Sequence, residues 1–222
     1  MSKRWVLADT ETTGLAVTDR VVEVAWMEID DGFNILGQGQ SLIDPGIPIP
    51  AGASAVHGIT NKDVIGAPGL ADYMATTNLN HGEMVFVAHN AAFDFKFLHM
   101  YLPEGTQQLC TVRLARKLWP DADNHKLATL VYALELDVEK ERFHSADGDM
   151  AVLLALLGRA HEEFGHSLED MLAIAQRIDP ITKMPFGAHK GKLLKDLPKS
   201  YIKWLLGLDN LERDLRAAIE SL

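Results

Sequence analysis

Two carboxylates two residues apart, Asp9 and Glu11, stand directly after the apolar run at residues 5–8. In a β-strand, residues i and i+2 point to the same face of the sheet, so both carboxylates would project into one place. Two like charges that close together repel each other, and a cation is needed to hold them. A hard divalent ion with oxygen ligands is the natural candidate, so the pair predicts a metal site at the end of a strand.

Two further segments supply partners for this pair. An apolar run at residues 85–88 leads through a polar turn to another carboxylate, Asp94. Farther along, His144 and Asp149 open a long segment of helical apolar periodicity. Four carboxylates of this kind could be neutralised by two Mg²⁺ ions, or by Mn²⁺ in their place, about 3.5–4 Å apart.

Three motifs therefore occur in a fixed order: DTETTGL at residues 9–15, HNAAFD at 89–94 and HSADGD at 144–149. Together they resemble the DnaQ-like 3′→5′ exonucleases of the DEDDh subgroup, over residues 3–164. The resemblance implies an α/β protein with a ribonuclease H-like fold, in which helices flank a mixed five-stranded sheet.

The resemblance also implies a role for each acid. Asp9 would bridge both metal ions, whereas Glu11 and Asp149 would hold the ion that carries the nucleophilic water. Asp94 would act mainly through water on the second ion. The spacing of the family motif favours Asp149 over its neighbour Asp147.

His144 lies five residues before Asp149, on the loop that leads into the predicted helix. An imidazole with a pKa of about 6.5 is suited to removing a proton from water at neutral pH. On its own, such a histidine would be interpreted as a surface residue before a helix. Alongside the three motifs, it is predicted to be the general base.

A second set of residues is predicted to contact the substrate. His57 lies in the segment AVHGIT at 55–60, which resembles a segment of the same family, and Leu15 is expected to wedge against a terminal base. Each has a structural alternative, namely a histidine that ends a helix and a leucine in the core. Asn90 is expected beside the substrate backbone, although a simple turn residue explains it equally well. The predicted substrate contacts are Thr10, Thr12, Gly14, Leu15, His57, Asn90, Lys190 and Lys192.

The elements that must position these residues follow from hydrophobic periodicity. Short apolar or alternating runs predict strands, and apolar residues at helical spacing predict helices. Strands that alternate with helices after an opening hairpin indicate a mixed sheet covered on both faces. We predict strands at 4–9, 20–30, 33–43, 83–88 and 107–110. We predict a helix that begins at Thr60, and further helices over 69–79, 91–102, 112–119, 127–134 and 146–164.

After the predicted exonuclease domain, residues 1–165, the pattern changes to a small basic and aromatic module, residues 166–222. From Lys183 to Trp204 there are six lysines against one acid, a formal charge of +5, which leaves −15 for the rest of a chain whose net charge is −10. Lysines mixed with aromatic residues are what gripping a nucleic-acid strand requires, and the extension also resembles that of a member of the same family. The alternative is a packing module whose aromatic residues form its own core.

Composition sets the outer limits. A chain of 222 residues that is 47% hydrophobic fits one cored domain with a small appendage. The single cysteine, Cys110, excludes an internal disulfide and fits a reducing compartment. The first residues show no apolar region of signal length, and no apolar run approaches the 18 or so residues of a membrane span. We therefore expect a cytoplasmic protein with no membrane attachment.

Together these features predict a metal-dependent 3′→5′ exodeoxyribonuclease. It would act on DNA 3′ ends, single-stranded or with overhangs, and release nucleoside 5′-monophosphates. An RNA-trimming exoribonuclease stays open as an alternative, because the choice depends on contacts with the 2′-hydroxyl. So does a polymerase proofreading subunit, and so does a homodimer, since members of the family often form dimers. A non-catalytic nucleic-acid-binding module is disfavoured, because it would be expected to have lost an acid or the histidine.

Overall fold

The computed structural model describes residues 3–138, 146–208 and 211–222. The chain divides into two compact units, Met1–Gln176 and Arg177–Leu222, and each is described here by itself. None of the described helices is both long and apolar enough to cross a membrane.

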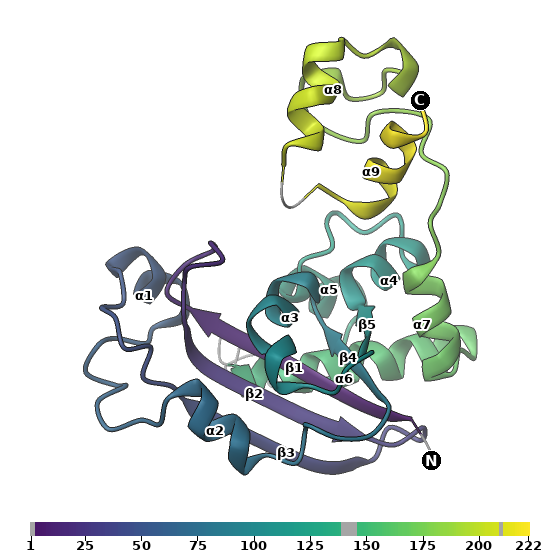
Figure 1. Ribbon diagram of the computed structural model, residues 1–222. Coiled ribbons are helices and arrows are strands. Elements are labelled where there is room, and N and C mark those ends of the chain that lie inside the picture. The colour runs from purple at the N-terminus through teal and green to yellow at the C-terminus, as the bar shows by residue number, and fades with distance from the viewer. Residues whose placement is uncertain (1–2, 139–145, 209–210) are drawn as a thin grey trace. The chain divides into compact units, whose positions relative to one another are not determined.

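A five-stranded mixed sheet forms the centre of the first unit, with the strand order β3-β2-β1-β4-β5 (Figure 1). The first three strands pair antiparallel, whereas β1 with β4 and β4 with β5 pair parallel. This confirms the predicted α/β class and ribonuclease H-like fold. The strands are β1 (Arg4–Thr12), β2 (Val21–Ile29), β3 (Ile35–Leu42), β4 (Met84–Ala88) and β5 (Gln107–Cys110).

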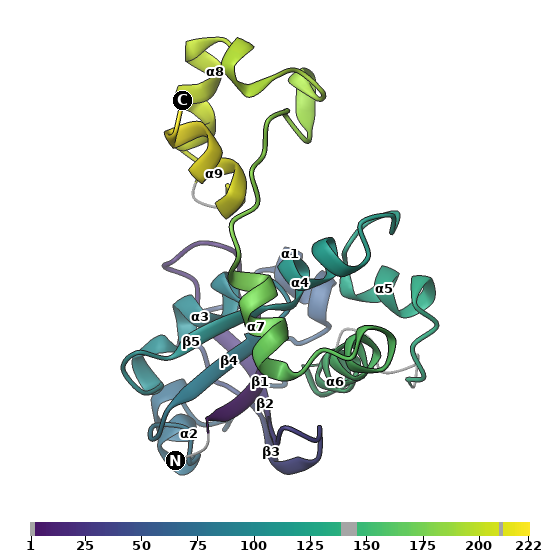
Figure 2. The same ribbon diagram turned by 90° about the vertical axis from the view of Figure 1, so that its right-hand side faces the viewer.

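Helices cover both faces of this sheet, and the alternation of side chains along β1 shows why. Trp5 and Leu7 point to one face and pack with residues of α4 to α7, whereas Val6 and Ala8 point to the other and pack with residues of α2 and α3. Figures 1 and 2 show the two layers on either side of the strands. The helices of this unit are α1 (Ala51–His57), α2 (Leu70–Thr76), α3 (Ala92–Leu98) with the 3₁₀ turn η1 (His99–Tyr101), α4 (Thr111–Leu118), α5 (Leu127–Ala133), α6 (Ala146–Phe164) and α7 (Leu168–Gln176).

Strand β1 is longer than predicted, and the difference matters for the acidic pair. Its parallel pairing with β4 ends at Leu7, opposite Val87, but its antiparallel pairing with β2 continues to Thr12. Asp9 is therefore paired with β2 on one side, but on the other side it lies beyond the last residue that pairs with β4.

The predicted helix start at Thr60 is wrong. Both the amide and the hydroxyl of Thr60 donate to Asp63 Oδ2, at 2.7 and 2.6 Å, and this closes a turn instead of opening a helix. The helix of this region, α1, comes earlier and ends at Gly58, whose φ of 79° lies in the left-handed region that glycine adopts readily.

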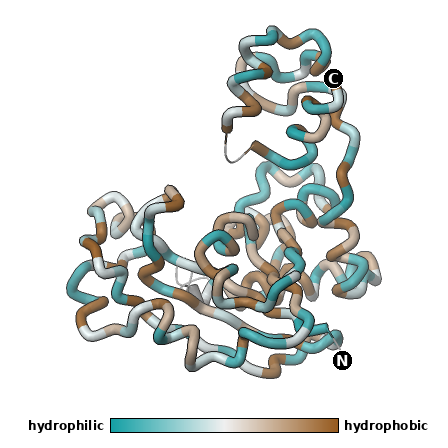
Figure 3. Tube along the Cα trace, in the orientation of Figure 1, coloured by the Kyte–Doolittle hydropathy of each residue, from teal (hydrophilic) through white to brown (hydrophobic). Residues whose placement is uncertain are grey.

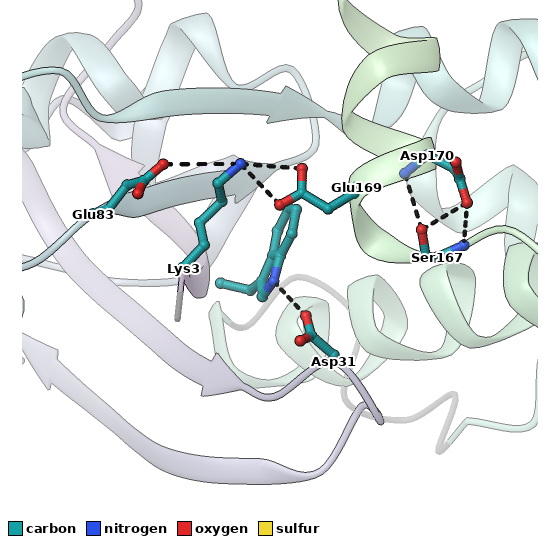
Figure 4. A network of polar contacts seen from close by, with 7 residues as sticks. Lys3, Asp31, Glu83, Ser167, Glu169 and Asp170 are labelled. Carbon is teal, nitrogen blue, oxygen red and sulfur yellow. Dashed lines mark hydrogen bonds and ion pairs between the residues drawn. The ribbon is translucent and has the colours of Figure 1, made fainter. Parts of the chain in front are cut away.

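The predicted boundary between residues 165 and 166 is also wrong, because α7 belongs to the first unit. Leu168, Met171 and Leu172 are buried in the same core as Trp5. Lys3, beside the start of β1, lies between Glu169 of α7, at 2.8 Å, and Glu83, at 4.0 Å (Figure 4). Ser167 caps the helix by exchanging hydrogen bonds with Asp170, also drawn in Figure 4. The partners on which α7 packs lie far from it along the chain, so the local pattern does not indicate them.

The second unit has a small core of its own, and hydrophobic and hydrophilic residues alternate along its trace (Figure 3). Its core is aliphatic: Met184, Leu194, Leu197, Leu205, Leu211, Leu215 and Ile219. One isolated bridge joins Lys183 and Leu193. Its elements are the 3₁₀ turns η3 (Gly187–His189) and η4 (Leu194–Asp196) and the helices α8 (Lys199–Leu206) and α9 (Arg213–Glu220).

Candidate functional site

Asp9 and Glu11 lie on one face of β1, as their spacing predicts. They continue the row of Trp5 and Leu7, whose face is covered by α6. Opposite Glu11 in the register of β2 stands Glu23, a buried carboxylate that accepts a hydrogen bond from Gln40 at 2.8 Å. The strand pair therefore carries three acids on adjoining positions.

Sequence reasoning missed Glu23. The hairpin register could have indicated it. In an antiparallel pair, a step of two residues forward on one strand corresponds to a step of two back on the other, so the pairing of Asp9 with Ala25 places Glu11 opposite Glu23. Glu23 was included in the predicted second strand, but its partner across the hairpin was not worked out.

Asp94 reaches the same place from the first turn of α3. Its side chain is only 2% exposed, and one of its oxygens, Oδ1, accepts hydrogen bonds from the Thr10 amide at 3.0 Å and the Thr10 hydroxyl at 2.8 Å. The turn before α3 runs through Asn90, whose φ of 73° is left-handed. Asparagine tolerates this conformation better than most residues, so the exposed Asn90 acts as a turn residue in this structure.

The carboxylates perturb one another strongly. Burial raises the pKa of Asp9 well above its ordinary value, and four neighbouring carboxylates raise it further: Asp94, Asp149, Glu11 and Glu23. Burial, with the charges of Asp149 and Glu23 next in importance and that of Asp94 after them, raises the pKa of Glu11 to about 7. Burial likewise raises the pKa of Asp94 to about 7, although the hydrogen bonds from Thr10 act in the opposite direction. A cation placed among these groups would remove the cause of the repulsion.

Asp149 and His144 differ in what the structure says about them. Asp149 lies in the first turn of α6, and its charge acts on both Asp9 and Glu11, which places it beside the pair. The side chain of Asp147 and the whole of His144 lie outside the described residues. The predicted general base therefore stays a prediction.

The donor set suits a hard divalent ion, because every group that converges on Asp9 is a carboxylate. Among the described residues, no group of three or more acidic, histidine or cysteine side chains has the geometry needed to bind a metal ion without rearrangement. Asp94 is instead directed at Thr10. The hydrogen bonds from Thr10 occupy Oδ1 only, and a metal would have to compete with the protons that the raised pKa values favour.

Leu15 is exposed, so the alternative of a core leucine is wrong. Its side chain is 82% exposed and that of Val17 is 81% exposed, in the loop that follows β1. This loop is nevertheless held in place. Lys96 of α3 donates to the Leu15 carbonyl at 2.7 Å, and its ammonium group lies over two aromatic rings, Phe93 at 4.3 Å and Phe97 at 4.5 Å.

Other bonds hold the same loop from within. The Thr12 hydroxyl donates to the Gly14 carbonyl at 2.7 Å, and Asp19 accepts from the Ala16 amide at 2.7 Å. The side chains of Thr10 and Thr12 are buried. Their hydroxyl groups are directed at Asp94 and at the Gly14 carbonyl, so these side chains hold the site in place. Their contact with a substrate stays a prediction.

His57 ends α1, as its structural alternative proposed, and also lies near the acidic strand pair. Its Nδ1 accepts a hydrogen bond from the Ile59 amide at 3.0 Å, while its buried Nε2 has no hydrogen-bond partner among the described residues. Burial lowers the pKa of His57, against the opposing effects of the Thr12 carbonyl and the Glu23 carboxylate. The ring therefore links the end of α1 to the end of β1, beside the acidic strand pair.

His89 has a structural task. Burial lowers its pKa to about 4, so the ring is neutral at pH 7. Its Nε2 lies 2.8 Å from the His125 carbonyl and must donate, which leaves Nδ1 to accept from the Thr111 hydroxyl at 2.9 Å. His89 thereby joins the end of β4 to the loop that precedes α5.

The remaining two predicted contacts, Lys190 and Lys192, lie in the second unit. Both are exposed, in the bend that contains η3. The structure does not relate them to the acidic site.

Comparison with protein families finds two matches. Residues 6–157 match the family described as Exonuclease. Residues 174–208 match a second family, which is named for a quorum-sensing-regulated virulence factor.

Two curated proteins are similar to this chain over different shares of its length. The chain is 32% identical over 222 residues to exodeoxyribonuclease 10 of Escherichia coli (strain K12), with 96% of each protein covered. It is 34% identical over 183 residues to a DNA polymerase III subunit epsilon-like protein of Rhodobacter capsulatus, a match that covers 75% of this chain and 26% of that protein.

Two solved structures show the same fold. An exonuclease X in complex with 5′ overhanging duplex DNA is 31% identical, with a TM-score of 0.64, and the match covers 77% of this chain and 99% of that one. A zinc-bound complex of Escherichia coli exonuclease I with single-stranded DNA is 17% identical, with a TM-score of 0.63 over 74% of this chain and 42% of that one.

Proposed function

Since the chain belongs to the exonuclease family, we propose that it is a metal-dependent 3′→5′ exodeoxyribonuclease that shortens DNA from its 3′ end. The observation that carries the proposal is the convergence of Glu11, Asp94 and Asp149 on Asp9 at one end of the sheet, where their charges raise the pKa of Asp9. Asp94 is buried and the other three acids are partly buried. Four carboxylates this close together and partly withdrawn from water repel one another strongly at neutral pH unless protons or cations neutralise them.

Exonucleases of this family generally depend on divalent metal ions. The carboxylates would hold two Mg²⁺ ions, with Asp9 shared between them, Glu11 and Asp149 on one, and Asp94 acting on the second through water. Once bound, such ions supply charge stabilisation at the phosphate and lower the pKa of water.

The protein's own groups would carry the rest of the reaction. His144 would take the proton from the attacking water as its oxygen bonds to phosphorus. The bond from phosphorus to the 3′ oxygen of the preceding nucleotide then breaks, and a nucleoside 5′-monophosphate leaves. Replacing His144 by Ala should slow this step by about 10²–10⁴-fold, and the loss should be largest where the imidazole is neutral.

The exposed Leu15 would contact the terminal base of the DNA. His57 and Asn90 would contact the DNA strand beside that base. An apolar side chain held away from the core suits contact with the face of a base. A duplex with a 5′ overhang, the ligand in the exonuclease X structure, is therefore a natural test substrate.

The test is a panel of 5′-labelled substrates of one sequence: single-stranded DNA, duplex DNA with a 5′ overhang, and RNA. We expect a ladder that shortens from the 3′ end in Mg²⁺ and no products in EDTA. Faster cleavage of RNA than of DNA would overturn the assignment to DNA, and release of the labelled 5′ nucleotide first would overturn the direction.

A pair of variants separates the site from the rest of the protein. Asp9→Asn should abolish cleavage, because the shared carboxylate is lost while the shape of the side chain is kept. Glu104→Gln is the matched control, since Glu104 is an exposed acid outside the site. An active Asp9→Asn protein would be incompatible with the proposed metal site.

A further inference from the structure

Two of the three aromatic residues of the second unit lie outside its core: Trp204 is 53% and Phe186 41% exposed. The third, Tyr201, is partly buried and packs against a core whose buried hydrophobic side chains are all non-aromatic. The contrast within the chain is large, because Trp5 is 1% and Trp119 is 9% exposed. The alternative in which these aromatic rings form the core of a packing module is therefore wrong for Trp204 and Phe186.

Three rings form a continuous array on α8 and the bend before it. Tyr201 and Trp204, three residues apart on one face of the helix, have ring centroids 5.2 Å apart at an interplanar angle of 32°. His189 meets the other side of Tyr201 edge-on, with centroids 4.4 Å apart and an angle of 71°. We call His189, Tyr201 and Trp204 the aromatic array.

The bend is shaped to bring His189 to the helix. Gly187 has a φ of 70°, and a Cβ atom on it would come within 3.0 Å of the Tyr201 hydroxyl oxygen. Gly191, with a φ of 84°, donates to the Met184 carbonyl at 2.7 Å, and Met184 donates in turn to the Lys192 carbonyl at 2.8 Å. Two glycines thus permit a tight bend whose backbone is fixed by its own hydrogen bonds.

His189 retains an unused polar atom. Its Nδ1 is buried and has no hydrogen-bond partner among the described residues. Such atoms are rare in folded proteins, and a bound group that donates to or accepts from Nδ1 would account for this one.

Positive charge surrounds the array. Six lysines of this unit are exposed, and in the described part of the chain none of them forms an ion pair with an acidic side chain. Outside Lys183–Trp204 the rest of the chain carries a net charge of −15, so this segment is where long-range electrostatics most favour a polyanion. The lysines are Lys183, Lys190, Lys192, Lys195, Lys199 and Lys203.

We propose that the aromatic array is a binding site for single-stranded DNA, in which an unpaired base stacks on Trp204 and the surrounding lysines contact the phosphates. Stacking on exposed aromatic rings and salt-dependent phosphate contacts are the usual means of gripping a single strand without reading its sequence. The choice of DNA rests on the proposed function of the first unit. The site adds a second place where the chain holds its substrate, apart from the acidic centre.

The experiment measures binding of a labelled oligothymidylate of about 16 nucleotides to the full chain in EDTA, by fluorescence anisotropy. Trp204→Ala should weaken binding by about 5- to 150-fold, and Trp204→Phe, which keeps an aromatic face, should restore most of it. Ile178→Ala is the matched control, because Ile178 is a 48% exposed hydrophobic residue of the same unit, and it should bind as wild type does. Circular dichroism of each variant verifies folding.

The lysines are tested by salt. The double variant Lys190→Ala with Lys192→Ala should reduce the slope of log Kd against log salt concentration by about 1.4, or about 0.7 for each lysine that no longer neutralises a phosphate. Equal binding by wild type and Trp204→Ala would overturn the stacking site, as would an equal loss on blunt duplex DNA. Tighter binding of oligouridylate than of oligothymidylate would overturn the choice of DNA.

Failure of the two proposals can be told apart. Hydrolysis of a small chromogenic phosphodiester by the wild-type protein in Mn²⁺ reports on the acidic centre alone. No hydrolysis there would count against the exonuclease, while the anisotropy result, obtained without metal, would still decide the aromatic array.

Discussion

Thr10 donates two hydrogen bonds to a single oxygen of Asp94, one from its amide at 3.0 Å and one from its hydroxyl at 2.8 Å. The amide is free to do so because β4 stops pairing with β1 at Leu7. The end of one strand pairing therefore creates the place where a carboxylate from α3 is fixed.

Thr10→Val keeps the shape of the side chain and removes the hydroxyl. Because the hydrogen bonds from Thr10 lower the pKa of Asp94, we expect a higher pKa and a weaker hold on metal. The Mg²⁺ concentration for half-maximal activity should rise by about tenfold, in line with one lost charge-assisted hydrogen bond. Thr10→Ser should restore it; an unchanged Mg²⁺ dependence in Thr10→Val would show that the hydroxyl does not act on Asp94.

The metal-free protein should lose stability as the pH rises towards 8. The pKa of Asp94 is about 7 in the folded chain, above the value of about 3.9 expected when unfolded. A raised folded pKa gives stability that is complete below the unfolded pKa and is lost as the pH rises through the folded pKa. Between pH 5.5 and 8 in EDTA, Asp94 alone should lower the free energy of unfolding by about 2 kcal/mol.

Urea denaturation at the two pH values measures this effect, and Asp94→Asn should flatten it. Mg²⁺ should stabilise the protein more at pH 8 than at pH 5.5, since fewer protons compete for the carboxylates. A larger stabilisation by Mg²⁺ at the lower pH would contradict the raised pKa values.

Lys96→Met should affect duplex ends more than single strands. Methionine keeps an apolar stem between Phe93 and Phe97 but loses the hydrogen bond to the Leu15 carbonyl. The Leu15 loop would then lose a fixed position, and kcat/KM on duplex DNA should fall about three- to tenfold relative to single-stranded DNA. Leu15→Ala should shift the same ratio in the same direction. If Lys96→Met lowers both activities equally, the lysine has no special link to the loop.

Truncation tests the corrected unit boundary. A chain ending at Gln176 keeps α7 and should unfold cooperatively, as the full first unit does. A chain ending at Gly165 lacks Leu168, Met171 and Leu172, each buried in the main core. Loss of a large buried side chain costs about 2–5 kcal/mol and whole domains have only about 5–15 kcal/mol, so the shorter chain should be unfolded or aggregated. Thermal melts of the two chains decide the matter.

The features that depend on local sequence pattern could be predicted. The alternation of β1 placed Asp9 and Glu11 on one face, and apolar runs located all five strands within a few residues. The helix at Thr60 failed because Thr60 and Asp63 carry a helix-start signature that here closes a turn on itself.

The rest depended on contacts between distant parts of the chain. Glu23 meets the other acids through the hairpin register, and α7 is held in the first unit by packing on β5 and α4 and by the ion pair between Lys3 and Glu169. The bond from Lys96 to Leu15 links residues 81 positions apart, and nothing in either local pattern indicates it.

Asp94 and Lys96 stand two residues apart in α3. The helix that carries a carboxylate of the acidic centre thus also anchors the loop that exposes Leu15, so any displacement of α3 moves both together. The position of the exposed Leu15 relative to the buried Asp94 is therefore governed by a single rigid element, so a substitution that tilts α3 should disturb the acidic centre and the loop at once.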